Sequence, residues 1–504
     1  MPDFNLYYGM LEERPYCYGL SQMENLEAVG VNRVRRIPGF DYRGNGIIIG
    51  LVDTGIDYGH PAFVEANGVS RVVTIWDQNG ETGAPPEGFD FGVEYGRTEI
   101  AEGTAPKDEN GHGTFLAGIA AGKEDRENNF AGVAPGAELA VVKLRQAPVE
   151  LKEYFCMPAD VVAFSEADIM QGVRYLVEYA VIQGKPLVLC LGVCCGLGSH
   201  RGTLPLSLYL NSLVYRPDLC LITAGGNEGN ARHHARVNLG NTQKEVELYV
   251  STRGSGFTME IFAEAIVELN LRIISPAGDD TPVVGSGFTE TEQFPLIFDR
   301  SILSVERENL MRTDTVQRIR IRVVRPATGI WRIQFGRSDM VAEVNLWLPI
   351  SEFLEGEVYF LESNPEVTLC EPANAPLLLA VGGYSTENNS LAPFSGRGFT
   401  ADGLIQPTLL APSVNVNGPF AGGGYIVKNG TSIGAAYTAG AVALLWEYME
   451  EYRRMGTVAP LDTVLIRNLF LLGAVRAEGE EYPSPAYGYG TLNLYGVFEF
   501  LRNL

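Results

Sequence analysis

Ser432 stands where a run of small residues meets a long apolar stretch, a setting that could activate a serine hydroxyl. Residues 429–436 read Asn-Gly-Thr-Ser-Ile-Gly-Ala-Ala, and residues 437–445 continue as a mostly apolar segment that predicts a helix. Free backbone N–H groups and the helix dipole favour negative charge at a helix N-terminus. An oxyanion formed when a serine attacks a carbonyl would be stabilised there. The alternative is a serine that only caps the helix.

Asp53 and His112 could supply the acid–base chemistry that such a serine needs. Asp53 follows residues 46–52, an apolar run rich in β-branched residues that predicts a buried parallel strand. Open α/β sheets bind ligands at the carboxyl ends of such strands, although Asp53 could instead cap the turn before Gly55. His112 lies between two glycines and opens a predicted helix of small residues at 112–122. A purely structural histidine is the alternative there.

Asn227 is a third candidate for chemistry. It lies in the glycine-rich turn 224–230, directly after an apolar strand predicted at 219–223. A side-chain amide on such a turn could donate a hydrogen bond to an oxyanion. The alternative is a turn asparagine that tolerates a left-handed backbone.

Strands and helices alternate around these candidates. Strands are predicted at 46–52, 138–144, 186–191 and 219–223, and helices at 112–122, 165–183 and 205–214. Ser165 and Asp168 resemble a capping box at the start of the second helix. The alternation predicts an α/β fold, with a parallel sheet covered by helices on both faces. The pattern resumes with a strand at 377–383, the helix that carries Ser432 and a helix at 461–472.

Residues 236–371 follow a different pattern. Short runs with a period of two, at 244–250, 318–323 and 329–335, predict antiparallel strands, and we expect an inserted β-sandwich. Its alternating arginines predict one solvated sheet face. The expected organisation is an N-terminal approach segment (1–45), a first α/β part (46–235), the insertion (236–371) and a second α/β part (372–504).

Composition limits the classes of function. The 504 residues allow two or three units at about 150 residues each. A formal charge of −23 argues against nucleic acid and anionic membranes as partners. Seven cysteines without metal-ligand spacing predict buried free thiols. Residues 1–6 show no signal peptide, and no apolar run reaches membrane-spanning length.

Four motifs occur together in one order: Asp-Thr-Gly-Ile-Asp at 53–57, His-Gly-Thr at 112–114, the Asn227 turn and Gly-Thr-Ser at 430–432. Together they resemble the subtilisin-like serine proteases, over residues 45–235 and 372–495. The resemblance implies an Asp53, His112 and Ser432 triad, with Asn227 as oxyanion donor. It also implies that the specificity pocket is lined by Leu191, Gly192, Ala224 and Gly225. It implies no cofactor for the chemistry, and it leaves a structural calcium ion undetermined.

A narrower resemblance concerns the insertion, because the clostridial Csp germination proteases carry a jelly-roll-like domain at this place. Residues 18–20 (Tyr-Gly-Leu) and 226–232 are also similar to that group. Family members commonly have alanine and proline where this chain has Gly434 and Ala436, so the helix start is expected to be looser. About 45 residues precede the first predicted strand, too few for a prodomain of ordinary size.

Two functions follow from these resemblances. One is a serine endopeptidase that acts on protein or peptide substrates, with a prodomain that is absent, removed or supplied separately. The other is a non-catalytic Csp-like pseudoprotease that acts as a sensor or binding protein. A cytoplasmic or spore-associated location is expected in either case.

Overall fold

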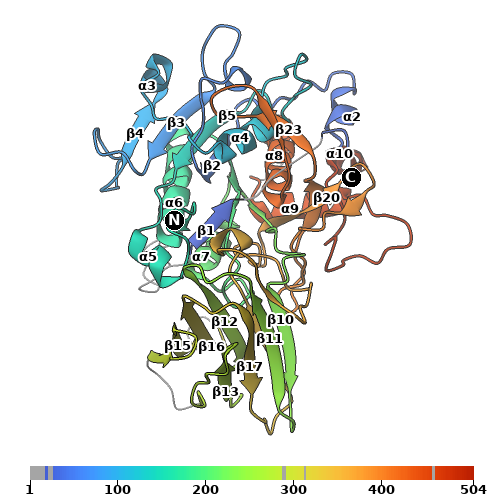
Figure 1. Ribbon diagram of the computed structural model, residues 1–504. Helices are drawn as coiled ribbons and strands as arrows, with labels where there is room; N and C mark the ends of the chain where they lie inside the picture. The colour runs from blue at the N-terminus through green and yellow to red at the C-terminus, as the bar shows by residue number, and fades with distance from the viewer. Residues whose placement is uncertain (1–16, 21–25, 286–290, 311–313, 457–459, 504) are drawn as a thin grey trace.

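The computed structural model describes residues 17–20, 26–285, 291–310, 314–456 and 460–503 (Figure 1). Residues 1–6, on which the signal-peptide prediction depends, lie outside this part. Figure 1 shows an α/β part that carries most helices and, below it, a part built of strands. Strands Ile48–Asp53 and Glu138–Lys143 belong to the first part, and the strands between His234 and Phe360 form the second.

A nine-stranded, mostly parallel sheet forms the centre of the α/β part. Its order is β21-β20-β9-β7-β2-β5-β3-β4, and β22 pairs with β20. Only the β3–β4 and β20–β21 pairs are antiparallel. The strands are β2 (Ile48–Asp53), β3 (Val72–Asp77), β4 (Val93–Gly96), β5 (Glu138–Lys143), β7 (Leu187–Leu191), β9 (Leu219–Ala224), β20 (Leu379–Ser385), β21 (Ser390–Leu391) and β22 (Leu409–Pro412).

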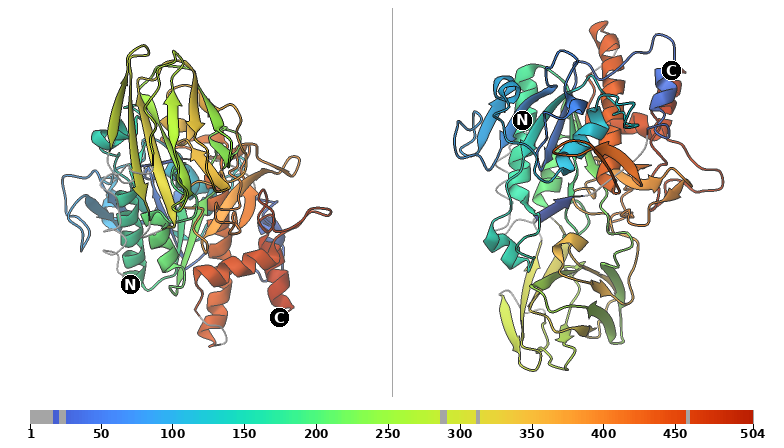
Figure 2. Two further views of the ribbon diagram at one scale, coloured as in Figure 1. Left: turned by 90° about the horizontal axis from the view of Figure 1, so that it is seen from below. Right: turned by 45° about the horizontal axis from the view of Figure 1, so that its top comes forward.

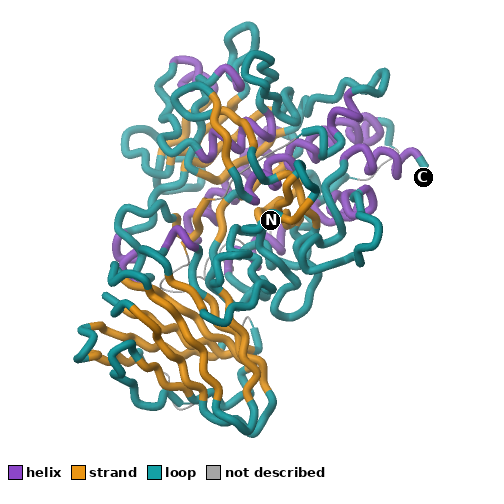
Figure 3. Tube along the Cα trace, turned by 45° about the vertical axis from the view of Figure 1, so that its right-hand side comes forward, coloured by secondary structure: helices purple, strands orange, loops and turns teal. Residues whose placement is uncertain are grey.

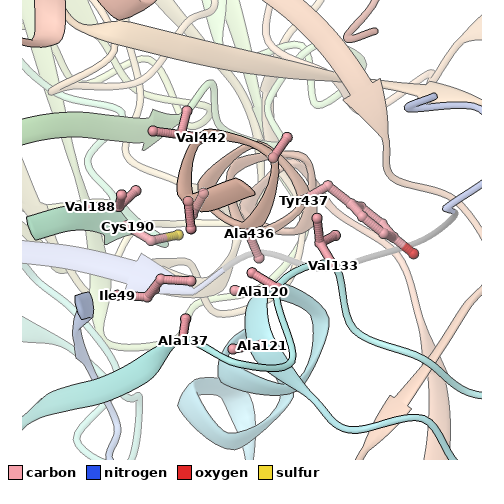
Figure 4. Close-up of a cluster of buried hydrophobic side chains, with 14 of the residues drawn as sticks. Ile49, Ala120, Ala121, Val133, Ala137, Val188, Cys190, Ala436, Tyr437 and Val442 are labelled. Atoms are coloured by element: carbon pink, nitrogen blue, oxygen red, sulfur yellow. The ribbon is translucent and has the colours of Figure 1, made fainter. Parts of the chain in front are cut away.

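Helices cover both faces of this sheet, as the alternating pattern predicts. Along β2, Ile49 and Leu51 face one apolar core, and Ile48 and Val52 face another. The first core contains α4 (His112–Ala121) and α8 (Thr431–Arg454), and the second contains α6 (Glu166–Gln183) and α7 (Pro205–Leu213). Figure 4 shows side chains of α4 and α8 meeting strand side chains in the first core. The other helices are α2 (Val31–Arg35), α3 (Arg97–Glu102), α5 (Val149–Tyr154), α9 (Thr463–Gly473) and α10 (Leu494–Arg502).

Two antiparallel sheets form the second part. The larger has the order β10-β18-β12-β16-β15-β14, and the smaller has the order β13-β17-β11-β19. Side chains from both sheets share one apolar core, which confirms the predicted β-sandwich. The strands are β10 (His234–Leu239), β11 (Lys244–Val250), β12 (Gly256–Glu264), β13 (Leu271–Ile274), β14 (Glu292–Leu296), β15 (Ser301–Asn309), β16 (Val316–Val324), β17 (Gly329–Phe335), β18 (Ala342–Trp347) and β19 (Val358–Phe360).

Figures 2 and 3 show this sandwich projecting from the α/β part, with the α-helices in the other part. Its strands lie between His234 and Phe360. Strand positions do not test the domain limits of 236 and 371, which stay predictions. The N-terminal limit at residue 45 stays a prediction too.

Two of the three arginines of β16 are buried and the third, Arg322, is half-buried, contrary to the solvated face predicted from their alternation. Arg318 and Arg320 are each 2% exposed. The guanidinium of Arg320 contacts the Glu260 carboxylate at 2.7 Å, and that of Arg322 lies 4.2 Å from the ring centroid of Tyr154 in α5. The prediction is wrong because α5, from the α/β part, covers this face. A period of two identifies a strand but not the element that packs on it.

The capping box predicted at the start of α6 is wrong as well. Ser165 occupies the N-cap position, but its side chain makes no capping hydrogen bond. Asp168 instead receives two hydrogen bonds from the Arg145 guanidinium, at 2.8 and 2.9 Å. The Asp168 carboxylate, which the pattern assigned to the helix start, therefore binds the Arg145 guanidinium instead.

The six cysteines whose side chains are described are buried and free, as predicted. Within the described residues, none of the helices is both long enough and apolar enough to cross a bilayer.

Candidate active site

Asp53 and His112 meet at the carboxyl end of the sheet. Asp53 is the last residue of β2, and His112 is the first residue of α4. Asp53 Oδ1 lies 2.8 Å from His112 Nδ1, and it also accepts the Thr54 N–H at 2.8 Å. Gly111 has φ 91°, a left-handed conformation that glycine adopts easily. The glycine next to His112 therefore sets the angle at which the imidazole enters the site.

Ser432 lies on the other side of the imidazole. Its Oγ is 3.2 Å from His112 Nε2. One ring nitrogen, Nδ1, therefore faces the Asp53 carboxylate, and the other, Nε2, faces the Ser432 hydroxyl. Helix α8 begins at Thr431 with Gly430 as its N-cap. The alternative of a capping serine is therefore wrong, because Ser432 is the second residue of the helix. Its hydroxyl stands beside the N–H groups of the first helical turn.

All three side chains are deeply buried. Asp53 and His112 are each 1% exposed, and Ser432 is 0% exposed. A low dielectric strengthens hydrogen bonds and charge interactions among them. A substrate can reach Ser432 Oγ only after the covering groups move.

Asn227 lies beside the start of α8. It follows β9 in the predicted turn, and its Oδ1 accepts the backbone N–H of Thr431 at 3.1 Å. The Thr431 hydroxyl donates to the same oxygen at 3.2 Å and accepts the Gly226 N–H at 3.0 Å. These contacts fix the amide plane of Asn227 next to the residue that precedes Ser432.

The four residues predicted for the specificity pocket lie close to the triad but differ in what they present. The side chains of Leu191 and Ala224 are buried in the two sheet cores. A Cβ at Gly192 would come within 3.0 Å of His112 Cε1, so only glycine lets the backbone pass the imidazole here. The Gly225 carbonyl accepts the N–H of Cys370. Their role in substrate binding stays a prediction.

A short strand near the N-terminus, β1 (Cys17–Leu20), lies between two edges of the α/β part. It pairs antiparallel with β6 (Phe164–Ser165) and with β8 (Val193–Cys194), so the order is β6-β1-β8. Leu20 lies opposite Val193, which directly follows Gly192. The extended segment therefore runs along β8 toward the glycine that touches His112. Nothing local in residues 17–20 indicates this pairing.

Sequence reasoning also missed the polar residues around a cavity of about 500 Å³ next to the triad. Thr54 and Asn110, neighbours of Asp53 and His112, line it together with Lys143. Lys143 ends β5 directly opposite Asp53. The rule that places ligands at strand ends could have identified Lys143.

Cys190 is a second nucleophile near Asp53, but its environment suppresses its reactivity. Burial, and secondly the Asp53 carboxylate, raise the pKa of the Cys190 thiol far above its usual range. Because the thiolate is the reactive form, Cys190 stays an inert packing residue. Across the described residues, no group of three or more histidine, cysteine or acidic side chains is placed to hold a metal ion.

Comparison with known proteins places this geometry in a family. The model of the Subtilase family matches residues 44–155 and 359–490, which contain Asp53, His112 and Ser432. A structure of the CspB protease of Clostridium perfringens superposes with a TM-score of 0.81 at 28% identity, covering 95% of this chain and 97% of that one. The chain belongs to the subtilase family. The α/β part therefore has the subtilisin-like fold, and the similarity to CspB extends through the β-sandwich.

Two curated subtilases are more distant. The minor extracellular protease Vpr of Bacillus subtilis is 23% identical over 491 residues, 91% of this chain and 52% of that protein. The subtilisin-like protease SBT2.3 of Arabidopsis thaliana is 27% identical over 218 residues, 38% of this chain and 24% of that protein. This subtilase spans about half or less of these two relatives.

Proposed function

We propose that this subtilase is a serine endopeptidase that hydrolyses peptide bonds through Asp53, His112 and Ser432. The observation that carries the proposal is the continuous contact from Asp53 Oδ1 to His112 Nδ1 at 2.8 Å and from His112 Nε2 to Ser432 Oγ at 3.2 Å. Both distances suit hydrogen bonds that tighten when a substrate binds.

The proposed reaction uses this chain's own groups at each step. His112 Nε2 takes the proton of Ser432 as Oγ attacks the scissile carbonyl, and Asp53 holds the imidazole in the required tautomer. The same nitrogen then returns the proton to the leaving amine, which forms the acyl-enzyme. Water hydrolyses that ester in a second round. No cofactor is needed for these steps.

We assign the oxyanion to the start of α8. The Ser432 backbone N–H and the Asn227 amide nitrogen are the proposed donors, and the helix dipole adds favourable partial charge. The hydrogen bond from the Thr431 N–H to Asn227 Oδ1 supports this assignment. Because the amide oxygen accepts that bond, the amide nitrogen is left as the donor of the same side chain.

The position of β1 supports a role for the N-terminal segment as the prodomain-like partner of this site. An extended chain paired on both edges has the backbone arrangement expected for a bound peptide. In this proposal the segment covers the site and is removed by the protease itself. Mass spectrometry should then find wild-type protein shortened near residue 20 and the Ser432→Ala variant uncut.

The burial of the triad favours a second candidate, a non-catalytic Csp-like sensor or binding protein. A fluorophosphonate probe separates the two functions. Wild-type protein should be labelled, and Ser432→Ala should lose the label and roughly 10⁶-fold in kcat, a magnitude borrowed from subtilisin, another member of this family. Ser390→Ala, at an exposed serine of the same part, is the matched control. Absence of labelling in folded wild-type protein, with and without the N-terminal segment, would support the sensor.

A further inference from the structure

Strand β12 of the sandwich contacts both of the segments that lead to the strands beside β1. Thr258 and Glu260 lie two residues apart on β12, so their side chains project from the same face of the sheet. Thr258 Oγ1 donates a hydrogen bond to the Phe155 carbonyl at 2.8 Å, and the Glu260 carboxylate accepts the Gly198 N–H at 2.9 Å. Both side chains are 0% exposed. One strand of the insertion therefore holds the chain before β6 and the chain after β8.

The Thr258 contact continues to β6 through a short loop. Phe155 follows α5, and two residues later the Met157 N–H donates to the Lys152 carbonyl at 2.9 Å. The Lys152 ammonium in turn donates to the Val161 carbonyl at 2.7 Å, three residues before β6 begins at Phe164. Phe155 and Phe164 also belong to the same apolar core. A displacement of Phe155 therefore moves the backbone of β6.

The Glu260 contact continues to β8 in the same way. Gly198 lies four residues after Cys194, the last residue of β8. Between them, Cys195 exchanges two backbone hydrogen bonds of 2.9 Å with Glu371. The connection is thus bonded at Cys195 and again at Gly198. The Glu260 carboxylate therefore fixes the course of the chain as it leaves β8.

One network of charged and polar side chains holds both contacts in place. The Arg320 guanidinium donates to the Glu260 carboxylate at 2.7 Å and to the Tyr154 hydroxyl of α5 at 3.0 Å. That hydroxyl donates to the Glu306 carboxylate at 2.6 Å. Helix α5 and Glu260 are therefore attached to the same buried arginine of the sandwich.

We propose that β12, through Thr258 and Glu260, sets the distance between β6 and β8 and thereby determines how tightly an extended chain binds between them. A chain in this position must pair with both strands, as β1 does. Because an N–H···O hydrogen bond is lost beyond about 3.5 Å, a shift of either strand by about 1 Å removes bonds to the chain between them. Thr258 and Glu260 are in this sense positioning residues.

The extended chain is β1 in the uncut protein and, in an inference that rests on the proposed endopeptidase function, the acyl side of a substrate after β1 has left. A chain that follows β1 along β8 runs toward Gly192 and His112. The sandwich then controls substrate affinity without touching the substrate or the triad.

Hydrogen exchange of β1 tests the positioning role in full-length protein that carries Ser432→Ala and stays uncut. Adding Thr258→Val should speed exchange of the backbone amides of residues 17–20 by about fivefold, the factor that one neutral hydrogen bond provides. Thr258→Ser keeps the hydroxyl and should exchange like the parent protein.

Thr281→Val is the matched control for this exchange experiment. Thr281 is 2% exposed, and its hydroxyl accepts the Ile273 N–H at 3.1 Å inside the sandwich. The control should leave the exchange of residues 17–20 unchanged. Exchange that Thr258→Val leaves unchanged, or that both valine variants speed equally, overturns the proposal.

Kinetics of protein with Ser432 intact test the same role on a substrate. Thr258→Val should raise KM by about fivefold for a peptide with four residues on the acyl side, with kcat unchanged, because the lost contact affects binding alone. Hydrolysis of a small nitrophenyl ester, which has no backbone to pair with β6 or β8, should stay at the wild-type rate.

Fluorophosphonate labelling separates this inference from the proposed function. Labelled Thr258→Val protein with a wild-type KM for the peptide overturns the positioning role and leaves the endopeptidase standing. Folded wild-type protein that is neither labelled nor able to cleave the peptide overturns the endopeptidase. The exchange rates of residues 17–20 then still decide whether β12 positions β6 and β8.

Discussion

The side-chain oxygen of Asn227 accepts the backbone N–H of Thr431 across 3.1 Å, one residue before the candidate nucleophile. The asparagine turn after β9 and the start of α8 are 204 residues apart in the sequence, yet this bond joins them directly. The bond therefore fixes the proposed oxyanion donor relative to Ser432, as preorganised electrostatic stabilisation requires.

Replacing Asn227 by alanine should lower kcat far more than it changes KM. The proposed amide donor acts on charge that develops in the transition state, and the loss is about 10²–10³ in kcat, a figure that comes from subtilisin itself. Steady-state hydrolysis of a small peptide measures it. Asn230→Ala, an exposed asparagine in the same loop, is the control. Equal kcat values for the two variants would remove Asn227 from the oxyanion site.

Gly192→Ala should damage the triad although it changes no catalytic group. Its methyl would lie 2.5 Å from Leu116 Cδ1, 3.0 Å from His112 Cε1 and 3.2 Å from Asp53 Oδ2. The imidazole must move, and a displacement of 1 Å can cost about 10²-fold in rate. Fluorophosphonate labelling rates report the loss directly. Gly240→Ala, with no atom within 4 Å of its methyl, should label at the wild-type rate.

Breaking the buried pair of Arg320 and Glu260 should destabilise the contact between sandwich and α/β part. The two side chains are 2% and 0% exposed. Arg320→Met leaves a buried carboxylate without its main partner, which costs about 3–5 kcal/mol in the free energy of unfolding. Combining Arg320→Met with Glu260→Leu should recover much of the loss. Urea unfolding measures both variants.

Arg272→Met provides the matched control for that experiment. Arg272 and Asp280 form an exposed pair at 2.9 Å, with side chains 43% and 49% exposed. Exposed pairs contribute about 0–1 kcal/mol. If Arg272→Met lowered the free energy of unfolding as much as Arg320→Met does, the buried location of Arg320 between the two parts would not explain the effect of its loss.

Acid should destabilise the fold through two buried histidines that stack on the indole of Trp347. Their ring centroids lie 4.2 Å (His200) and 4.9 Å (His234) from the indole. Burial, and secondly the charge of His234, lower the pKa of His200 from 6.5 to about 3. Burial lowers that of His234 from 6.5 to about 4. Because the unfolded chain binds these protons more readily, the contribution is complete above about pH 6.5 and is lost as the pH falls toward 4 and 3.

Urea unfolding at about pH 7 and pH 4.5 tests this pH dependence. Carboxylates add their own acid sensitivity, so the comparison is between wild-type protein and His200→Gln, which cannot take up that proton. The variant should lose less unfolding free energy between the two pH values. An equal loss in both proteins would contradict a neutral, buried His200.

Several elements were predictable because a local pattern determines them. The apolar run before Asp53 could only be a buried strand, and the alternating residues at 244–250 and 329–335 match β11 and β17 residue for residue. The placement of His112 and Ser432 at helix starts also followed from glycines and small residues nearby. Local sequence was sufficient wherever the structure depends on neighbours along the chain.

Long-range packing explains what the sequence could not show. The arginines of β16 have the pattern of a solvated face, and only α5, about 165 residues earlier, makes that face buried. The contacts of Ser351 with Glu228 and of β1 with β8 join segments 123 and about 170 residues apart. Two-residue strands such as β6 and β8 carry no period long enough to detect.

Strand β1 belongs to the same chain as the two strands that flank it, so in the proposed peptidase its competition with a substrate depends on effective concentration. A short tether holds a segment near its site at a local concentration on the order of millimolar. A substrate at micromolar concentration is then outcompeted by β1, even when the substrate and β1 have the same intrinsic affinity. Cutting the chain between Leu20 and Val31 would turn β1 into a diffusible ligand, whose occupancy falls on dilution. Whether β1 occupies its position between β6 and β8 would thus depend on whether one peptide bond between Leu20 and Val31 is intact or cleaved.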